Sequence, residues 1–68
     1  MRRKLTPAQL EILWWSSLGF QDKEIAARTG RSTATVRTLA AAAMVRVGAH
    51  TRAGAIYRAV RLGELRLP

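Results

Sequence analysis

The chain has 68 residues, 49% of them hydrophobic, and it contains no cysteine. This length fits one small domain with a modest core, predicted to span residues 1–68, and the composition excludes a disulfide framework and a thiolate metal site. Twelve Lys and Arg against four Asp and Glu give a net charge of +8, which favours a polyanionic partner, nucleic acid before an anionic membrane surface.

Residues 1–4, Met-Arg-Arg-Lys, are expected to form a basic N-terminal arm. They mimic the charged start of a signal peptide, but Pro7, Gln9 and Glu11 interrupt the sequence before an apolar region develops. The longest apolar run, residues 39–45, is far shorter than the roughly twenty residues of a membrane span. We therefore expect no secretion signal and no membrane partner, and the lack of cysteine fits a reducing cytoplasm.

The first predicted helix covers residues 7–18. Thr6 is suited to the N-cap and Pro7 to the first helical position, where its missing N–H costs nothing. Apolar side chains spread around much of this helix, so it should be largely core. Trp14 and Trp15 are expected in the core and at its rim rather than stacked on bases.

Two further helices are predicted over residues 21–28 and from the cap Ser32 to Val47. A small residue, a glycine and two aliphatic residues at set spacings are what two helices joined by a tight turn require. In this sequence those positions are Ala26, Gly30, Val36 and Leu39. The pattern predicts a helix-turn-helix.

A fourth helix is predicted over residues 52–62, with Thr51 as its cap. The side chains expected to face inward are Ala55, Ile56, Ala59 and Val60. Ala53, Tyr57 and Arg61 share another face at four-residue spacing, which offers a self-complementary stripe for a homodimer formed on DNA. The predicted fold class is all-α, a four-helix helix-turn-helix domain.

Polar and basic side chains gather around the third helix, a pattern typical of contacts with phosphates and base edges in the major groove of double-stranded DNA. Arg37 and Thr38 are candidates for base contacts. The candidates for phosphate contacts are Lys23, Arg31, Ser32, Thr33, Thr35 and Arg46. Ser32 and Thr33 would cap the helix equally well without DNA.

In this order and at these spacings the motifs resemble the LuxR-type (GerE-like) helix-turn-helix domain, from Leu5 to about Leu65. The matching residues are Leu5-Thr6-Pro7, part of Gln9 to Leu13, Gly19, Lys23-Glu24-Ile25-Ala26, Ser32, Thr35-Val36-Arg37, Arg52, and Ala53 to Ala59. The resemblance implies a transcription regulator that pairs through its last helix. It also makes position 41 a base-reading position, where this chain has Ala41 in place of the family's frequent basic residue.

The alanine block at residues 40–43 leaves a second interpretation open. It could bring the backbone close to the groove and to thymine methyl groups, or form an apolar face that docks on RNA polymerase, a sigma factor or another regulator. A promoter reader similar to sigma region four is a third interpretation. We expect either an excised C-terminal domain or a stand-alone cytoplasmic regulator, the latter consistent with a phage or accessory-element origin.

The sequence contains no pattern that indicates a metal site or a catalytic site. His50 is the only histidine, so it makes no metal site and is expected at the surface. No Ser, Asp and His set and no pair of carboxylates is placed for catalysis. We therefore expect no enzyme activity and no cofactor.

Overall fold

The computed structural model describes residues 4–68, and that range contains four helices and no strand. In chain order they are α1 (Pro7–Ser17), α2 (Asp22–Thr29), α3 (Thr33–Val47) and α4 (Arg52–Arg61). The predicted all-α helix-turn-helix fold is confirmed, with each helix end within one residue of its predicted position. Of the expected basic arm at residues 1–4, all but Lys4 lies outside the described residues.

Side-chain caps explain where the helices begin. Thr6 accepts a hydrogen bond from the backbone N–H of Gln9 (3.1 Å), and the Gln9 side chain accepts one from the N–H of Thr6 (3.0 Å). This reciprocal pair is a capping box, which satisfies two of the free donors at the start of α1. Ser32 and Thr51 cap α3 and α4 in the simpler way, each accepting the N–H three residues on.

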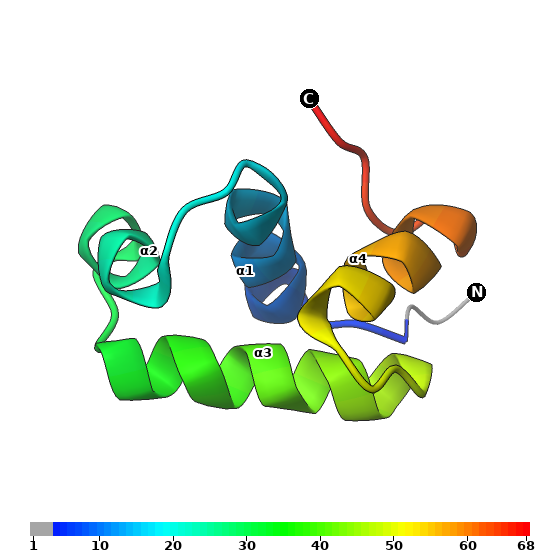
Figure 1. The fold of residues 1–68 in the computed structure, drawn as a ribbon, viewed down its shortest axis with the longest axis horizontal. Helices are drawn as coiled ribbons and strands as arrows, with labels where there is room; N and C mark the ends of the chain where they lie inside the picture. The colour runs from blue at the N-terminus through cyan, green and yellow to red at the C-terminus, as the bar shows by residue number, and fades with distance from the viewer. Residues whose placement is uncertain (1–3) are drawn as a thin grey trace.

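The longest helix, α3, runs along one side of the molecule, and the other three helices lie across it (Figure 1). It packs against α1, α2 and α4, whereas α2 and α4 do not pack against each other. The side of α3 that faces away from the other helices is exposed, as the accessibility of Thr38, Ala41 and Val45 indicates. None of the described helices has the length and hydropathy needed to cross a bilayer.

The core has two parts, both built on α1 and α3. One part joins α1, α2 and α3 around Ile12, Ile25 and Val36, all fully buried. The other joins α1, α3 and α4 and includes Leu13 and Ala43. Leu5 and Leu65 close this second part from the two ends of the chain.

The alanine block is divided between the core and the outer side of α3. Ala40 and Ala43 are buried in the core, while Ala41 is exposed and Ala42 is half-buried. Four consecutive residues of a helix point in four directions, so the block is shared between the core and the outer side of α3. Small side chains at the buried positions let α3 lie close to the helices that cross it.

Three residues that the sequence predicts to face inward are exposed or only half-buried. Val60, expected to face inward, is 39% exposed, and Ile56 is only half-buried. The buried stripe of α4 consists of Ala55 and Ala59, four residues apart, and Val60 lies about 100° around the helix from Ala59. Leu39, expected in the core, is half-buried against it.

The two ends of the described chain are tied together by Glu64. Its carboxylate accepts hydrogen bonds from the backbone N–H groups of Lys4 (3.0 Å) and Leu5 (2.8 Å). Leu65, the next residue, is buried in the core beside Leu5. The segment after α4 therefore helps to hold the start of α1 in place.

Candidate nucleic-acid interface

The turn between α2 and α3 sets the direction of α3. Gly30 ends α2 in the left-handed conformation (φ 68°, ψ 26°), and the N–H of Arg31 donates to the carbonyl of Ala26. Ser32 then caps α3 from an extended conformation. Ala26 and Val36 are buried between the two helices, as the sequence predicts for a helix-turn-helix.

The outer side of α3 carries the candidates for base contacts. Arg37, Thr38 and Ala41 are all exposed, and the Arg37 side chain is 71% accessible. Ala41 lies four residues after Arg37 and three after Thr38, so the three share one side of the helix, while Val36 and Ala40 point into the core. A helix with an open face of this kind is what the major groove of DNA accepts.

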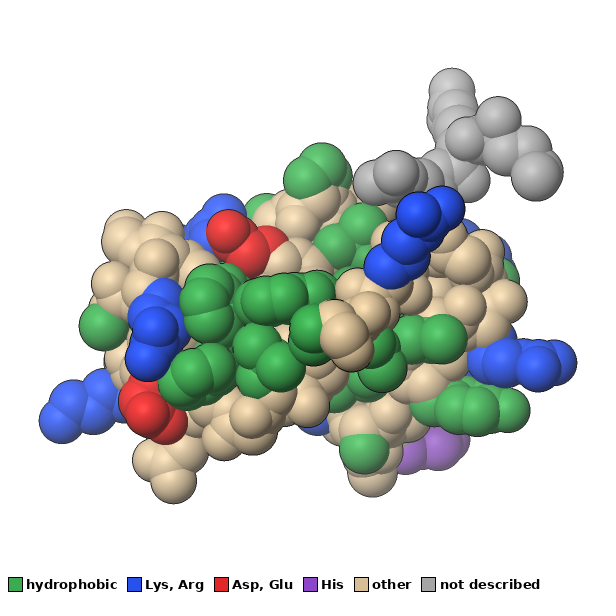
Figure 2. All heavy atoms as spheres, turned by 90° about the horizontal axis from the view of Figure 1, so that it is seen from above, with side chains coloured by type: hydrophobic (Ala, Val, Ile, Leu, Met, Phe, Trp, Pro, Cys, Tyr) green, Lys and Arg blue, Asp and Glu red, His purple; other side chains and the backbone are tan. Residues whose placement is uncertain are grey.

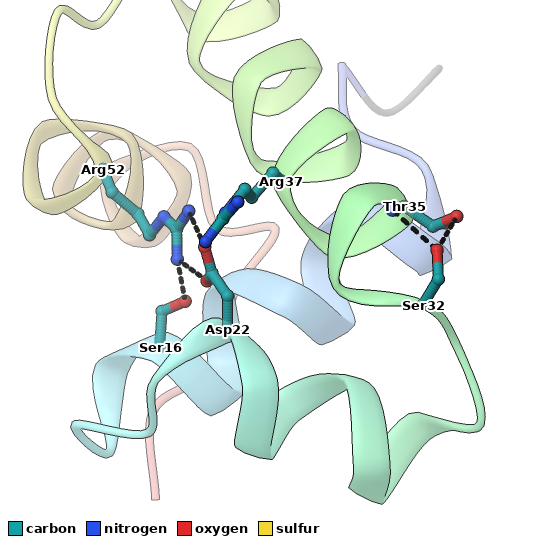
Figure 3. A network of polar contacts seen from close by, with 6 residues as sticks. All are labelled: Ser16, Asp22, Ser32, Thr35, Arg37 and Arg52. Atoms are coloured by element: carbon teal, nitrogen blue, oxygen red, sulfur yellow. Dashed lines mark hydrogen bonds and ion pairs between the residues drawn. The ribbon is translucent and has the colours of Figure 1, made fainter.

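Ser32 and Thr35 are already engaged with each other at the start of α3 (Figure 3). The Ser32 hydroxyl oxygen accepts from the Thr35 N–H (3.1 Å), and the hydroxyl donates to the Thr35 hydroxyl oxygen (2.9 Å). Thr33 is half-buried in the first turn. Ser32 therefore caps the helix, and the Thr35 O–H remains able to donate to a phosphate.

The four candidate cations occupy different settings. Lys23 is exposed in the first turn of α2, and Arg46 is exposed in the last turn of α3. Arg31 is half-buried in the turn and forms an ion pair with Glu11 of α1. Arg37, the fourth, is held by an acidic residue that the sequence did not mark as part of the site.

That residue is Asp22, at the start of α2 (Figure 3). Its carboxylate accepts hydrogen bonds from both terminal nitrogens of Arg52, and Oδ2 also lies 3.5 Å from Nε of Arg37. The hydrogen bonds from Arg52, with the charges of both arginines, lower the pKa of Asp22, an effect that burial opposes in part. Because Arg52 also reaches the Ser16 hydroxyl (3.5 Å), all four helices meet at this point.

The outer face of α4 carries the candidates for pairing. Ala53, Tyr57 and Arg61 are exposed, with Tyr57 64% accessible. A shallow groove of about 540 Å³ runs along this helix, and Tyr57 and Arg61 line it together with Val47 and Leu62. An exposed tyrosine on a face outside the core is a suitable centre for a contact between two copies.

The tryptophans lie where the sequence predicts, against the core. Trp14 packs on the part shared with α4, and Trp15 packs on the part shared with α2. Trp15 and Phe20 meet edge to face, and the Arg28 guanidinium lies 4.3 Å from the centre of the Phe20 ring. The end of α1 and the loop that follows it lie on the side of the molecule opposite α3 (Figure 1), and hydrophobic side chains gather on the face seen from that side (Figure 2).

Within residues 4–68, the other polar side chains include no metal-binding group and no unpaired buried atom. His50 is exposed, in the loop before α4. No group of three or more His, Asp or Glu residues within residues 4–68 is placed to hold a metal ion. Every buried side-chain nitrogen or oxygen in this part of the chain has a hydrogen-bond partner, so no orphaned polar atom marks a further ligand site.

Sequence reasoning missed the ion pairs around the interface. Asp22 lies in the first turn of α2, where a carboxylate suits the positive end of a helix, but its bond to Arg52 links residues 30 apart in the chain. Arg31 and Glu11 are 20 residues apart. No local sequence pattern indicates such pairs, because they depend on how the helices pack against one another.

Comparisons with known proteins agree on one family. A sequence profile described as "Bacterial regulatory proteins, luxR family" matches residues 3–59. A solved structure titled "Structure of Transcription factor, GerE" superposes with a TM-score of 0.92 and 31% sequence identity, covering 98% of this chain and 100% of that one. A search of curated proteins finds no match.

Proposed function

Because the chain belongs to the luxR family of bacterial regulatory proteins, which are DNA-binding transcription regulators and not enzymes, we propose that it binds double-stranded DNA with α3 in the major groove. A bacterial regulator of this kind acts in the cytoplasm, on the nucleoid or in an infected host. The single observation that carries the binding mode is the open face of α3, with exposed Arg37 at its centre.

Base contacts are assigned to the first half of α3. Arg37 reaches a guanine edge, and Thr38 and Ala41 approach the neighbouring base pairs, where their methyl groups suit a thymine methyl. An alanine at position 41 brings no charge or hydrogen bond to the groove. Readout on this face therefore depends on one arginine and on apolar contact.

Phosphate contacts surround that face. We assign them to the exposed cations Lys23 and Arg46 and to the start of α3. Arg31 would also contact a phosphate, which would replace Glu11 as its ionic partner. The first turn of α3 contributes Ser32, Thr33 and Thr35, next to backbone N–H groups at a positive helix end. A net charge of +8 adds attraction at longer range.

Two copies are proposed to pair on DNA through α4. Ala53, Tyr57 and Arg61 would meet their equivalents across a two-fold axis, and the two α3 helices would enter successive major grooves about 10 base pairs apart. Arginine faces arginine across such an axis, so pairing in free solution should be weak. DNA then supplies the energy that brings the copies together.

A protein-docking module is the second candidate, and Val45 favours it. This side chain is 80% exposed on α3, next to Ala41 and Ala42, and could contact RNA polymerase or another regulator. The burial of Ala40 and Ala43 leaves a small patch for such a partner. We therefore rank this function below DNA binding.

Titration of the protein with a labelled duplex of random sequence, at two salt concentrations, tests the proposal. Counterion release predicts binding that weakens steeply with salt, by roughly 10³ or more between 50 and 200 mM when six or more phosphates are contacted. Val45→Ser is the matched variant, because it removes the apolar patch and leaves the charge unchanged. Absent binding at low salt would contradict DNA binding and leave the docking function as the better account.

A further inference from the structure

Asp22 of α2 is in ionic contact with both the interface helix α3 and α4. Its side chain is only 17% accessible, and its carboxylate is held by Arg52 from α4 and contacted by Arg37 from α3. Since α2 and α4 do not pack against each other, the hydrogen bonds from Arg52 to this carboxylate bridge the two helices. It is therefore a fixed anion beside an otherwise open helix face.

Arg37 approaches the Asp22 carboxylate with Nε, so its two terminal nitrogens remain available for contact with DNA. The closest approach is made by Nε, 3.5 Å from Oδ2, and neither terminal nitrogen of Arg37 forms a hydrogen bond within residues 4–68 (Figure 3). Guanine is recognised by the fork of an arginine, through two parallel hydrogen bonds to O6 and N7. A guanidinium held at Nε keeps its terminal nitrogens free for that purpose.

We propose that Asp22 is a positioning residue that holds Arg37 for contact with guanine and so sets base specificity without touching DNA. The inference rests on the proposed binding of α3 in the major groove. A free arginine has many rotamers and can move to a nearby phosphate, which carries no sequence information. Asp22 limits this movement because its negative charge holds the side chain near one place and is itself repelled by phosphate.

Selection from a pool of duplexes with randomised sequence tests this role. The enriched sites of the wild-type protein should contain a position at which guanine is preferred. Arg37→Ala should abolish the preference at that position, and Asp22→Asn should reduce it about five-fold or more while leaving other positions unchanged. In the Arg37→Ala background, Asp22→Asn should have no further effect on base preference.

Glu24→Gln is the matched control. It removes the same charge from the same turn of α2, and glutamine can still accept the N–H of Gln21 that Glu24 accepts at 2.9 Å. Both neutralised variants should bind random duplex more tightly, but only Asp22→Asn should relax base preference. Circular dichroism at the binding temperature confirms that each variant is folded.

The outcomes separate this inference from the proposed function. If the wild-type protein binds no duplex, the proposed function fails and Asp22 has no role in binding. If Arg37→Ala relaxes a guanine position and Asp22→Asn does not, DNA binding stands and the positioning role is wrong. A uniform loss at all positions in Asp22→Asn also overturns the role, because it would show a purely structural effect on α2 and α4.

Discussion

At the residue scale, Arg37 should contribute a measurable share of the affinity for DNA. Its side chain is 71% accessible and outside the core, so Arg37→Ala should weaken binding by about 1–3 kcal/mol without unfolding the domain. Arg66→Ala is the control, since it removes an equal charge from the exposed C-terminal segment on the side opposite α3 (Figure 1). Equal losses in the two variants, measured by fluorescence anisotropy, would mean that Arg37 acts only through its charge.

Asp22 should make stability depend on acid pH. Its hydrogen bonds with Arg52 hold the pKa below the ordinary value of 3.8, so the unfolded chain binds the proton more readily than the folded one. The stabilisation is fully present above that ordinary value and is lost as the pH falls through the lower, folded-state pKa.

Denaturant unfolding between about pH 6 and pH 2 measures this dependence. Asp22→Asn should be less stable than the wild-type protein near pH 6, and the difference should shrink at the acid end. The other carboxyl groups are the same in both proteins, so the difference between the two stabilities isolates Asp22. A difference that stays constant over the whole range would show that the ion pair with Arg52 contributes no stability.

Single residues with local roles were predictable, whereas pairs were not. Thr6, Ser32 and Thr51 were recognised as caps because a cap acts on an N–H three residues away. The bond between Asp22 and Arg52 joins residues 30 apart and depends on how α2 and α4 are placed over α1. Placement of this kind follows from packing, which a single sequence does not display.

At the element scale, Gly30 decides where α2 ends and α3 begins. A side chain at this position would meet no atom within 4 Å, so the cost of Gly30→Val arises from the left-handed backbone alone (φ 68°). We expect a loss of on the order of 1 kcal/mol or more, since β-branched residues avoid this conformation. Thermal unfolding measures it.

Gly30→Asn provides the control for that expectation. Asparagine tolerates the left-handed conformation better than valine does, so this variant should be the more stable of the two. Equal melting temperatures for the two variants would show that conformation at residue 30 is not what limits the turn. A valine variant as stable as the parent would place the essential turn elsewhere.

Helix burial was predicted better for α1 than for α4. Branched and long apolar residues mark the core side of α1, and Leu10, Ile12 and Leu13 are indeed buried. On α4 the buried side chains are those of Ala55 and Ala59, while the larger Val60 is exposed. A prediction from hydrophobic periodicity assigns the larger apolar residues to the core. It fails for a helix that lies so close to its neighbours that only small side chains fit between them.

At the scale of the whole molecule, pairing should require DNA. The proposed α4 face places Arg61 near its own equivalent across a two-fold axis, and each chain carries a net charge of +8. Sedimentation should therefore find a monomer in free solution and two proteins on a duplex with an inverted repeat. Tyr57→Ala should weaken the second binding event on that duplex, because it removes the exposed aromatic centre of the face.

Two results of that experiment would contradict the account. A stable dimer without DNA would show that repulsion between the arginines does not limit pairing. One protein per duplex at saturation would remove the paired geometry altogether. Ala27→Ser, an exposed position on α2, is a neutral comparison that should leave both binding events unchanged.

The tie between the chain ends was also invisible in the sequence. Glu64 accepts hydrogen bonds from the backbone N–H groups of Lys4 and Leu5, which are 60 and 59 residues away in the chain. The segment after α4 that carries Glu64 has no regular secondary structure. The sequence resemblance placed the domain between Leu5 and about Leu65, and those two residues meet in the core. The resemblance gave no physical reason why the domain ends near Leu65; the hydrogen bonds of Glu64 and the burial of Leu65 supply one.

The position of α3 in the major groove is the central claim, and amide chemical-shift mapping tests it most directly. Isotope-labelled protein is titrated with a duplex of about 20 base pairs, two helical turns, at low salt. We predict that the largest shifts fall on residues 33–41 and the first turn of α2, with little change at the end of α1. Shifts concentrated around Trp15 and Phe20, on the face opposite α3, with the first half of α3 unaffected, would contradict the account.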